Sequence, residues 1–531
     1  MPPRRPMSLD ELLRALPAEA HAVIRGTADA RAVEVCSLAY DSRSVEPGAL
    51  FFCVPGFARD GHEFAPAARE HGASAFVVER ELGFGLPEVE VVSARAAMAP
   101  LAARFNGDPS RELRVVAVTG TNGKTTTAFL VRTLLERARV RCGLLGTVKS
   151  VIGGRELAVA RTTPEAIDLQ ADLRAMLDAG DRACAMEVSS HALALSRAEQ
   201  LHTAAAIFTN LTQDHLDFHS DMEDYFLAKR RLFASAEGAR IVNVGDPYGA
   251  RLARELPAAV TFALEAELPA GERADYLASD VRCAPDGSSF TLHSPDGVRE
   301  LRLALPGRFN VGNALGAIAA VRSLGVEPEL IADALAERVS VPGRLQPVNE
   351  GQPFTVLVDY AHTPDSLRRV LEAARELASA PVRGAEGERA AERGRLICVF
   401  GAGGDRDRGK RPLMGEAAAR GADVVLLTSD NPRSEDPEAI IAELLHGVRA
   451  GGRELHEGAA EAIADRKRAI SRAIELARDG DVVVIAGKGH EQGQELANGR
   501  LVPFDDASVA REALRSARPL DRGARRAGAA A

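Results

Sequence analysis

A glycine-rich turn between an apolar run and a helix constrains this chain more than any other feature. Residues 113–118 form an apolar run of β type, and the turn GTNGKTTT starts directly afterwards at Gly120. Ala128, Val131, Leu134 and Leu135 then recur at helical spacing. A strand, a glycine-rich turn and a helix in this order are typical of a loop that holds phosphate groups.

The residues inside the turn carry the chemistry of this prediction. Gly120 and Gly123 let successive N–H groups point inward, Lys124 adds a positive charge, and the hydroxyl of Thr125 is where such a loop holds Mg²⁺. Val118 stands where the general pattern has its first glycine, so this is a compact form. A tight turn without a ligand is the alternative, but it does not explain Gly, Lys and Thr at these offsets. We therefore predict that the loop binds ATP or a close relative.

Composition narrows the class of protein. With 531 residues, the chain suits about three domains. Hydrophobic residues make up 46% and charged residues 27%, and no apolar run reaches the length of a membrane span. The first residues lack the apolar segment of a secretory signal, and the six cysteines are scattered, so we expect reduced thiols in a cytoplasmic protein. The net charge of −9 argues against nucleic acid as a partner.

The order of strand and helix signals predicts an α/β protein of three domains. We expect a first domain at 1–107, a central domain with a mostly parallel sheet at 108–343, and a Rossmann-like third domain at 344–516. The motif around Gly343 and Arg344 reads as the hinge into the third domain. Residues 382–395 are predicted to be a solvated loop, and residues 517–531 a disordered tail.

The first domain contains predicted strands at 32–39, 50–54 and 73–78 and a predicted helix at 62–71. Asp41, Ser42 and Arg43 follow the first of these strands, where hydroxyl and guanidinium donors could hold a small acidic ligand. A structural turn is the better interpretation of these three residues taken alone, because Asp and Ser favour turns generally.

Polar residues follow two further strands of the central domain. Glu187 ends one apolar run, and Asp214 and His215 follow the strand at 204–209, before a helix that carries Lys229. Taken singly, each has a structural explanation: a capping acid, a hydrogen-bonded histidine and a lysine on a solvated face. Ligands bind at the carboxyl ends of strands in parallel α/β sheets, which favours a role for Glu187 and His215 beside the phosphate loop.

The remaining pattern extends the central domain and builds the third. Residues 280–305 alternate in a way that predicts an appended β-hairpin with a turn at 294–297, and a helix is expected at 311–324. Four apolar runs of the third domain end in DYAHTP, GAGGDRDRGKRP, SDNPRSEDP and GKGHEQ. Charged residues therefore gather at the carboxyl ends of its parallel strands.

Taken together, these motifs resemble those of the Mur ligases, ATP-dependent enzymes that form the amide bonds of the peptidoglycan peptide. GTNGKTTT, MEVSSH, TNLTQDHLDFH, DYFLAK, VDYAHTP, GAGGDRDRGKRPLM, DNPR and AGKGHE occur in the family's order, and the match covers residues 30–510. The resemblance implies addition of meso-diaminopimelate to a UDP-MurNAc-dipeptide through an acyl phosphate, with Mg²⁺ and ATP. DNPR is the motif that this family associates with diaminopimelate rather than lysine.

The resemblance also implies a role for each matching position. The ATP-binding residues would be Gly120, Thr121, Asn122, Gly123, Lys124, Thr125, Thr126, Asn310, Arg344 and Asp359. One Mg²⁺ would lie on Thr125 and Glu187, and a second on His215 and a carboxylated Lys229. The UDP-substrate residues would be Tyr40, Ser42, Phe57, Ala58, Arg59, Thr162, Thr163, Ser189 and Arg197. The diaminopimelate pocket would comprise Arg406, Asp430, Asn431, Pro432, Arg433, Gly487 and Glu491.

Three departures from the family fall among substrate contacts: Arg161 replaces an asparagine, Leu195 replaces a glutamine, and residues 57–59 differ from His-Gln-Ala. Two classes of rival remain, a sister ligase such as folylpolyglutamate synthase or the lysine-adding enzyme, and a P-loop ATPase switch or silent binding protein. DNPR argues against the first class, and the presence of Glu187, His215 and Lys229 argues against the second. We expect small-molecule substrates only, without nucleic acid or membrane, and a monomer, although the sequence leaves the oligomeric state open.

Overall fold

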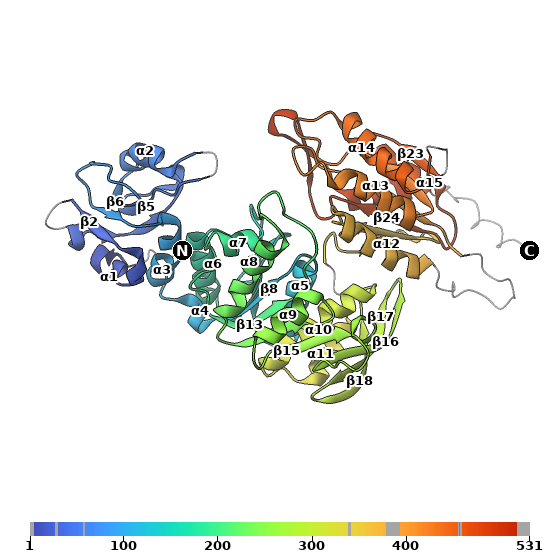
Figure 1. Ribbon diagram of the computed structural model, residues 1–531, viewed down its shortest axis with the longest axis horizontal. Helices are drawn as coiled ribbons and strands as arrows, with labels where there is room; N and C mark the ends of the chain where they lie inside the picture. Colours follow the sequence, from blue (N-terminus) through green and yellow to red (C-terminus); the bar gives the residue numbers. More distant parts are fainter. Residues whose placement is uncertain are drawn as a thin grey trace, which may run out of the picture.

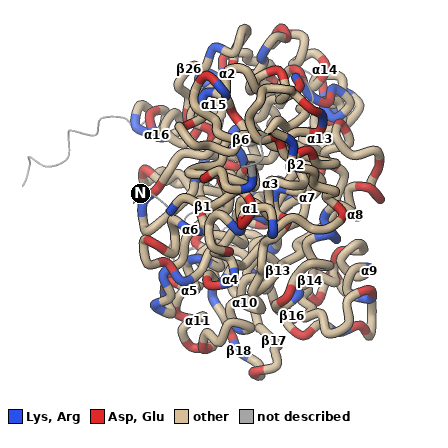
Figure 2. The backbone as a smooth tube through the Cα atoms, turned by 90° about the vertical axis from the view of Figure 1, so that its left-hand side faces the viewer, with Lys and Arg blue, Asp and Glu red and all other residues tan. Residues whose placement is uncertain are grey.

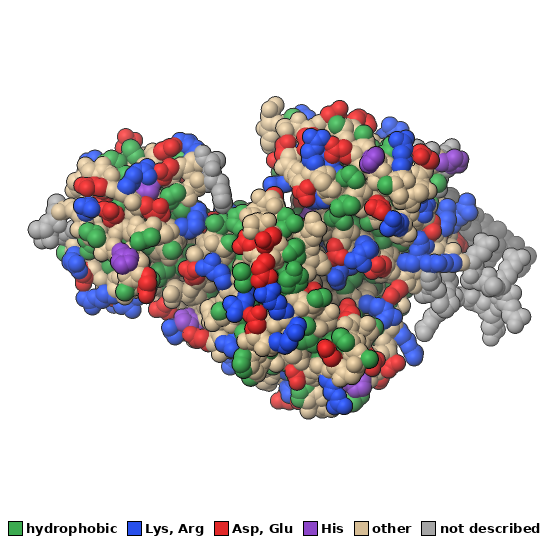
Figure 3. Space-filling view, in the orientation of Figure 1, with side chains coloured by type: hydrophobic (Ala, Val, Ile, Leu, Met, Phe, Trp, Pro, Cys, Tyr) green, Lys and Arg blue, Asp and Glu red, His purple; other side chains and the backbone are tan. Residues whose placement is uncertain are grey.

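The computed structural model describes residues 5–26, 30–56, 59–337, 341–378, 393–454, 456 and 459–517. Within these ranges, three large sheets lie in three successive lobes, and the first and third lobes stand apart on the central one (Figures 1 and 3). The α/β class expected from the sequence is confirmed. The boundaries at 107/108 and 343/344 stay predictions. The predicted loop and tail lie outside the described residues, apart from residues 393–395 and Ala517, the last residue of a helix.

The first lobe is built on a five-stranded sheet in the order β2-β7-β6-β5-β4. Its strands are β2 (Val23–Arg25), β4 (Ser37–Ala39), β5 (Ala49–Phe52), β6 (Ala73–Val78) and β7 (Glu88–Glu90). Its helices are α1 (Leu9–Leu13), α2 (Ala65–Glu70) and α3 (Ala94–Phe105), and the short helix α4 (Pro109–Glu112) that follows packs on the central lobe.

Two local predictions for this lobe need correction. The strand expected at 32–39 is two short strands, because β3 (Glu34–Val35) pairs with β1 (Met7–Ser8) while β4 pairs with β5. The helix expected at 62–71 begins as a 3₁₀ turn at Gly61–Phe64 and continues as α2. Asp60 caps this turn by accepting a hydrogen bond from the backbone N–H of His62 (3.0 Å).

The central lobe contains an eleven-stranded sheet that is parallel in its middle. The parallel strands are β9 (Cys142–Leu145), β12 (Ala183–Glu187), β8 (Arg114–Thr119), β13 (Thr203–Phe208), β14 (Ala239–Asn243), β15 (Val260–Leu264) and β16 (Tyr276–Ala284), in spatial order. Glu187 is in register with Val118, and Phe208 with Thr119. The carboxyl ends of β8, β12 and β13 therefore reach the same edge of the sheet.

Antiparallel strands flank this parallel centre. β10 (Ser150–Ile152) and β11 (Arg155–Leu157) extend one edge. At the other edge, β17 (Gly287–Ser294) and β18 (Gly297–Leu303) form the predicted hairpin. The hairpin pairs with β16, so it continues the central sheet rather than forming a separate unit.

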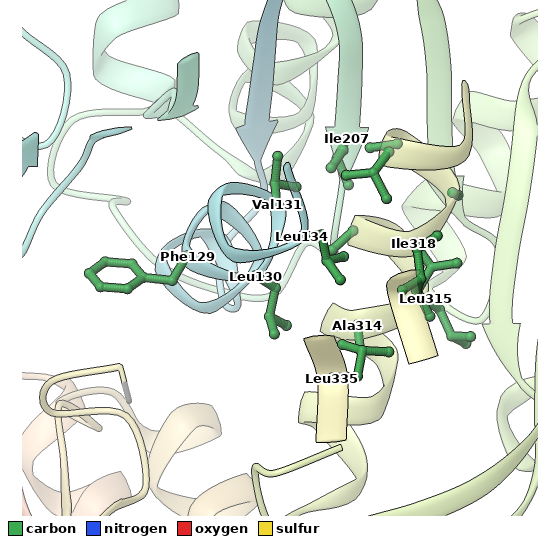
Figure 4. Packing of buried hydrophobic residues seen from close by; sticks show 14 of the residues in the cluster. Phe129, Leu130, Val131, Leu134, Ile207, Ala314, Leu315, Ile318 and Leu335 are labelled. Atoms are coloured by element: carbon green, nitrogen blue, oxygen red, sulfur yellow. The ribbon is translucent and has the colours of Figure 1, made fainter. Parts of the chain in front are cut away.

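Helices cover both faces of the central sheet. One face is covered by α5 (Lys124–Arg137), α10 (Arg308–Ser323) and α11 (Pro328–Ala336), and the other by α6 (Ala166–Asp178), α7 (Ser190–Ala194), α8 (Met222–Ala234) and α9 (Pro247–Glu255). Leu134 of α5 lies among Leu315 and Ile318 of α10 and Ile207 of β13 (Figure 4). Burial of each such side chain contributes about 1.5–3 kcal/mol, so this core fixes α5 and the loop before it.

The third lobe has a six-stranded sheet in the order β19-β20-β24-β21-β22-β23, parallel except for β19. Its strands are β19 (Gln346–Pro347), β20 (Thr355–Asp359), β21 (Leu396–Phe400), β22 (Val424–Leu427), β23 (Ala460–Ala462) and β24 (Val482–Ala486). One face packs on α12 (Pro364–Ala378), α13 (Lys410–Gly421) and α14 (Pro437–Ala450), and the other on α15 (Arg466–Leu476) and α16 (Asp506–Ala517). A separate hairpin joins β25 (Gly493–Leu496) to β26 (Arg500–Pro503).

Three surface and covalent features bear on the sequence predictions. All six cysteines lie in the described ranges and are free thiols. Among the described helices, none combines the length and apolar character needed to cross a membrane. Acidic and basic residues are interspersed along the chain and over the face in view (Figures 2 and 3).

Candidate active site

The phosphate loop connects β8 to α5, and its two glycines have conformations that other residues rarely adopt. Gly120 has φ +147° and Gly123 has φ +87°. A Cβ atom at Gly120 would collide with the Thr209 hydroxyl, and one at Gly123 with the Asn313 amide oxygen. Glycine is therefore required at both positions by backbone conformation and by space.

Residues after the neighbouring strand β13 brace this loop. Thr121 N–H donates to the Asn210 carbonyl (2.8 Å), and Asn122 N–H donates to the Asn210 amide oxygen (2.9 Å). The Thr209 hydroxyl donates to the Asn122 carbonyl (2.6 Å). These bonds hold the loop rigid, while the N–H groups of the first turn of α5, including those of Thr125 and Thr126, have no partner within the helix. Such a terminus attracts anions.

Lys124 folds back onto its own loop. Its ammonium donates to the carbonyls of Gly120 (2.9 Å) and Thr121 (2.7 Å). Burial lowers the pKa of Lys124, while the charges of Glu187 and Asp214 oppose that shift. The cation is thus placed over the loop by local hydrogen bonds before any phosphate arrives.

An acidic and hydroxyl cluster lies at the end of β12, beside the start of α5. The Thr125 hydroxyl donates to Oε2 of Glu187 (2.9 Å), whose side chain is buried. Thr147 donates to the same carboxylate twice, from its N–H to Oε1 (2.7 Å) and from its hydroxyl to Oε2 (3.1 Å). A Cβ at Gly146 would lie 2.5 Å from Oε1, so Gly146 leaves room for the carboxylate. Thr147 was not predicted from the sequence, although the Gly-Thr pair directly after β9 was a signal for it.

His215 lies in a strained turn after β13, with φ +55°. Its ring is 4.8 Å from the ring of His191, centroid to centroid, and its Nε2 is 3.4 Å from Oδ2 of Asp214. Burial lowers the pKa of His215, and the Asp214 carboxylate opposes this effect. A neutral imidazole is the form that can offer a lone pair to a cation.

Lys229 of α8 is buried, which contradicts the solvated-face interpretation of this lysine alone. Its Nζ donates to the Gly120 carbonyl (2.8 Å) and lies 4.6 Å from the centre of the Tyr225 ring. Burial and the charge of Lys124 lower the pKa of Lys229 well below its usual range. Helical spacing places Lys229 on the same face as Tyr225, four residues earlier, and this buried face explains the correction.

A cavity of about 430 Å³ lies between the central and third lobes, around the phosphate loop, Glu187, His215 and Lys229. Most residues predicted for ATP, Mg²⁺ and muramoyl-peptide line it: Thr121 to Thr126, Thr162, Thr163, Glu187, Ser189, Arg197, His215, Lys229, Arg344 and Asp359. The predicted residues of the first lobe and of the diaminopimelate pocket are not among the lining residues.

The third lobe reaches this cavity through Arg344 and Asp359. Arg344 donates from Nη2 to the Thr125 hydroxyl (3.2 Å), and its guanidinium lies 4.7 Å from the centre of the Tyr360 ring. Asp359 accepts hydrogen bonds from the N–H groups of Leu345 (2.7 Å) and Ala361 (2.8 Å). The aspartate therefore fixes the hinge segment from which Arg344 extends.

Asn310 is buried and lies behind the cavity wall. Its amide donates to the Pro306 carbonyl (2.8 Å), and its oxygen accepts from Asn313 (3.2 Å). Asn313, one turn later on α10, lines the cavity instead. In this structure Asn310 supports a cavity residue rather than facing the cavity itself.

The residues predicted for the muramoyl-peptide connect to the Glu187 cluster. The hydroxyls of Thr162 and Thr147 are 3.0 Å apart, and the Thr163 hydroxyl donates to the Glu187 carbonyl (3.0 Å). Ser189 N–H donates to the Thr163 hydroxyl (3.1 Å). Thr162 and Thr163 are therefore held at the rim of the cluster.

Ion pairs connect the first lobe to the central lobe near Arg197. Glu165 is buried and pairs with Arg197 (2.9 Å) and with Arg95 of α3 (3.3 Å). Glu165, which was not predicted from the sequence, connects helix α3 of the first lobe to the predicted substrate residue Arg197.

The first lobe meets the central lobe through Tyr40, whose hydroxyl donates to Asp168 of α6 (2.6 Å). Ser42 is buried, and its carbonyl accepts a hydrogen bond from Nδ1 of His71 (2.7 Å). Asp41 caps the 3₁₀ turn Ser42–Ser44 by accepting from the Arg43 N–H (3.0 Å), as the structural-turn interpretation of this segment predicts.

The other uridine-pocket residues are only partly described. Arg59 pairs with Glu63 (3.1 Å) and stacks on Phe64 at 4.3 Å from the ring centre. Phe57 and Ala58 lie outside the described residues.

A polar cluster forms at the carboxyl ends of β22 and β24 in the third lobe. Lys488 is fully buried and donates to the Asn431 amide oxygen (2.8 Å) and to Oε2 of Glu491 (2.8 Å). The Asn431 amide donates to the same carboxylate oxygen (2.9 Å). Lys488 was not predicted as a site residue, although a lysine close after the buried strand β24 was a signal for it.

The loop after β22 is shaped by its neighbours. Gly487 has φ +116°, and a Cβ atom there would collide with the Asp430 carboxylate. The Pro432 carbonyl accepts from the Glu435 N–H (3.0 Å), which turns the chain toward α14. A Cβ at Gly404 would collide with the Pro432 carbonyl, so the two loops are in close contact.

Arg433 and Arg406 come from neighbouring strand ends. Arg433 donates from Nε to Glu495 (2.7 Å) and from Nη1 to the Gly404 carbonyl (2.8 Å). Arg406 is exposed. A Cβ built at Gly403 would lie 3.1 Å from Nη1 of Arg433 and 3.8 Å from Cγ of Arg406, so both arginines border Gly403.

Comparison with known proteins gives one consistent result. Three family models match successive segments: "Mur ligase family, catalytic domain" at 34–106, "Mur ligase middle domain" at 118–321, and "Mur ligase, glutamate ligase domain" at 343–489. A similar relative is the UDP-N-acetylmuramoyl-L-alanyl-D-glutamate–2,6-diaminopimelate ligase of Syntrophomonas wolfei. It is 45% identical over 488 residues, which cover 91% of this chain and 95% of the relative.

Solved structures of Mur ligases have the same fold as this chain. A structure of a UDP-N-acetylmuramoyl-L-alanyl-D-glutamate–2,6-diaminopimelate ligase aligns with TM-score 0.65 and 32% identity over 96% of this chain and 99% of that one. The MurF ligase of Thermotoga maritima in complex with ADP aligns with TM-score 0.59 over 85% and 93% of the two chains. Its 18% identity makes that likeness one of fold alone.

Proposed function

The chain belongs to the Mur ligase family, and we propose that within it the enzyme joins diaminopimelate to UDP-N-acetylmuramoyl-L-alanyl-D-glutamate at the expense of ATP. The relatives of this activity cover nine-tenths of the chain, at 45% identity for the Syntrophomonas protein. The observation that carries the proposal is the cavity that brings the phosphate loop, Glu187 and Arg344 together. The product would be a precursor of the peptidoglycan peptide.

The donor set at Glu187 fits Mg²⁺. The hydroxyl of Thr125 and the carboxylate of Glu187 are hard oxygen ligands in direct contact, and Mg²⁺ takes few protein ligands of this kind beside substrate phosphates. When bound, the ion would offset negative charge between ATP and the substrate carboxylate. Lys124 donates to the loop and Arg344 donates to the Thr125 hydroxyl, so both add positive charge of their own near this pair.

We infer that Lys229 becomes carboxylated. As a cation it would repel a metal ion, and its buried ammonium donates to a backbone carbonyl, that of Gly120 (2.8 Å). The neutral amine can attack CO₂: a C–N bond forms, a C=O electron pair moves to oxygen, and a proton leaves nitrogen. The resulting carbamate is an anionic oxygen ligand that, together with His215, suits a second Mg²⁺.

The proposed reaction has two steps. First, an oxygen of the D-glutamyl carboxylate attacks the γ-phosphorus of ATP, and the bond to the leaving ADP oxygen breaks. The diaminopimelate amine then attacks the acyl carbon, phosphate leaves with the C–O electron pair, and the amine loses a proton. Both substrates of the first step are anionic, so charge neutralisation by Lys124 and Arg344 lowers the barrier.

The polar cluster of the third lobe supports diaminopimelate as the amine substrate. Diaminopimelate differs from lysine by a second carboxylate, and an arginine can donate two parallel bonds to that group. Arg433 and Arg406 border the same glycine, and the Glu491 carboxylate, held by the Asn431 amide, can receive the distal ammonium. A lysine substrate has no second carboxylate to accept these bonds.

At the opposite end, the first lobe would hold the uridine nucleotide. Tyr40 ties this lobe to α6 of the central lobe, and Thr162 with Arg197 lines the route from there to the Glu187 cluster. The substrate would thus extend from the first lobe to the cavity, with its glutamyl carboxylate reaching the phosphate loop.

One assay tests the whole proposal. We expect ADP release with UDP-MurNAc-L-alanyl-D-glutamate to depend on diaminopimelate and to be matched mole for mole by tripeptide product. Equal turnover with lysine would favour the lysine-adding sister enzyme, and equal turnover with a folate and glutamate would favour a folylpolyglutamate synthase. A rate of ATP hydrolysis that does not change when any of these substrates is added would identify a P-loop ATPase instead.

A further inference from the structure

The hairpin of β25 and β26 forms hydrogen bonds with the loop that carries Arg433. Gln494 donates from its amide to the Asp430 carbonyl (2.6 Å) and to the Ser429 hydroxyl (3.1 Å). Glu495 N–H donates to the Asn431 amide oxygen (2.9 Å). The hairpin therefore contacts successive residues of the loop after β22, with Glu495 at the centre of these contacts.

Glu495 holds both the backbone and the side chain of Arg433. Its carbonyl accepts from the Arg433 N–H (3.2 Å), and its Oε2 accepts from the Arg433 Nε (2.7 Å). Arg433 has φ +50°, a left-handed conformation that is uncommon for a residue with a long side chain. Such a conformation persists where surrounding contacts determine it, and Glu495 supplies two of those contacts.

These contacts use one part of the guanidinium and leave another available. Nε is taken by Glu495, and one hydrogen of Nη1 by the Gly404 carbonyl. The guanidinium has five N–H groups in a fixed plane, so the end formed by Nη1 and Nη2 keeps donors for a ligand. The Arg433 side chain is 22% exposed, which is consistent with a fork that a small ligand can still reach.

We propose that Glu495 is a positioning residue that sets the plane of Arg433 for the distal carboxylate of the amino-acid substrate. This inference rests on the proposed diaminopimelate-adding function. By binding Nε, the Glu495 carboxylate directs the Nη1–Nη2 end outward and removes rotamers in which the side chain lies elsewhere. A guanidinium already fixed in plane loses less conformational freedom when a carboxylate binds.

Two variants of Glu495 separate its charge from its geometry. In Glu495→Gln the amide oxygen still accepts from Nε but the charge is lost, while Glu495→Ala removes the acceptor. Glu512→Ala is the matched control, because Glu512 forms an exposed ion pair with Lys467 (2.9 Å) on the same lobe. KM and kcat would be measured for diaminopimelate and ATP, and kcat/KM for lysine.

For Glu495→Ala we expect the KM for diaminopimelate to rise roughly 10- to 100-fold with kcat changed far less, the scale on which misplaced binding groups act. The KM for ATP and the weak kcat/KM for lysine should stay near the wild-type values. Glu495→Gln should fall between wild type and Glu495→Ala, and Glu512→Ala should match wild type.

Three outcomes overturn the inference: an unchanged KM for diaminopimelate in both Glu495 variants, equal losses for diaminopimelate and lysine, or a parallel rise in the KM for ATP. The last two would indicate a general structural role for the hairpin. If Glu495→Ala fails to fold, the KM for diaminopimelate in Glu495→Gln tests the inference alone. This variant keeps the acceptor atom and should fold, so an unchanged KM would then overturn the inference. If the wild type does not prefer diaminopimelate to lysine, the proposed function fails, and the inference falls with it.

Discussion

The Oγ1 hydroxyl of Thr125 donates a 2.9 Å hydrogen bond to Oε2 of Glu187, although 62 residues separate them in the chain. The contact exists because β8 and β12 are parallel neighbours whose carboxyl ends are in register. It places a hydroxyl and a carboxylate at the start of α5, where phosphate would lie.

Thr125→Val removes the hydroxyl at nearly constant volume, and Thr125→Ser keeps it. We expect Thr125→Val to lower kcat at least roughly 100-fold, the scale for losing one preorganised polar group at a reacting centre. Thr125→Ser should retain most of the activity and the wild-type dependence on Mg²⁺ concentration. Steady-state kinetics across a Mg²⁺ titration measure kcat and the Mg²⁺ dependence of both variants. A kcat near the wild-type value in Thr125→Val would refute the proposed role of Thr125 as a Mg²⁺ ligand.

Lys124→Ala tests the phosphate loop itself. Its ammonium lies over the loop through bonds to Gly120 and Thr121, so its removal takes away charge without removing a core side chain. We expect ligation to fall by at least about 10²–10³-fold while the melting temperature stays close to that of wild type. The exposed Lys467→Ala is the control for loss of a lysine. Full activity in Lys124→Ala at saturating ATP would exclude the phosphate-binding role.

Lys229→Ala tests carboxylation. We expect the variant to lose activity and to regain part of it when a short carboxylic acid fills the space left by the carbamate. The depressed pKa of Lys229 keeps its amine reactive near neutral pH, so ¹³C-labelled CO₂ should give a carbamate signal in wild type but not in the variant. An active wild-type enzyme with a bare amine would contradict this prediction.

The choice of amino acid can be measured at Arg433. Charge-assisted hydrogen bonds are worth about 1.5–3 kcal/mol each, and lysine would leave the Nη1–Nη2 end of the Arg433 guanidinium without a carboxylate. We expect wild type to prefer diaminopimelate over lysine by roughly 10²–10⁴-fold in kcat/KM. Arg433→Ala should lose most of this preference, and Arg433→Lys should recover only part, because an ammonium cannot bind a carboxylate through a planar fork. Retention of the full preference in Arg433→Ala would show that the distal carboxylate binds elsewhere.

Asp172 on α6 gives a pH-dependent prediction about stability. Burial, with a smaller contribution from the Asp168 charge, raises the pKa of Asp172 to about 7. Between pH 4 and 7 the folded state therefore binds more protons at this group than the unfolded state, so its contribution to stability falls as pH rises. Asp172→Asn should leave stability unchanged near pH 4 and increase it by on the order of 1 kcal/mol at pH 8. Denaturant unfolding at both pH values measures this, and an equal effect at both would exclude the titration.

Much of the local fold was predictable because it depends on near neighbours in the chain. The apolar run before Gly120 and the helical spacing after it predicted β8 and α5, and the strand at Ala73–Val78 was predicted at its observed bounds. The strand predicted at 32–39 was wrong as a single element, because its halves pair with different strands. Pairing partners are a property of the whole sheet, which local pattern does not contain.

The sequence by itself determined which residue types could bind phosphate and where the turns that carry them lie, since Gly120 and Gly123 meet a requirement of backbone conformation that is local. Only the tertiary structure decided that Lys229 is buried, that Thr147 holds Glu187, and that Glu495 holds Arg433. Burial and ion pairing depend on which strands become neighbours, and that is settled by packing across the sheets. Segments far apart in the sequence then meet at one sheet edge, where their side chains complete one another's hydrogen bonds.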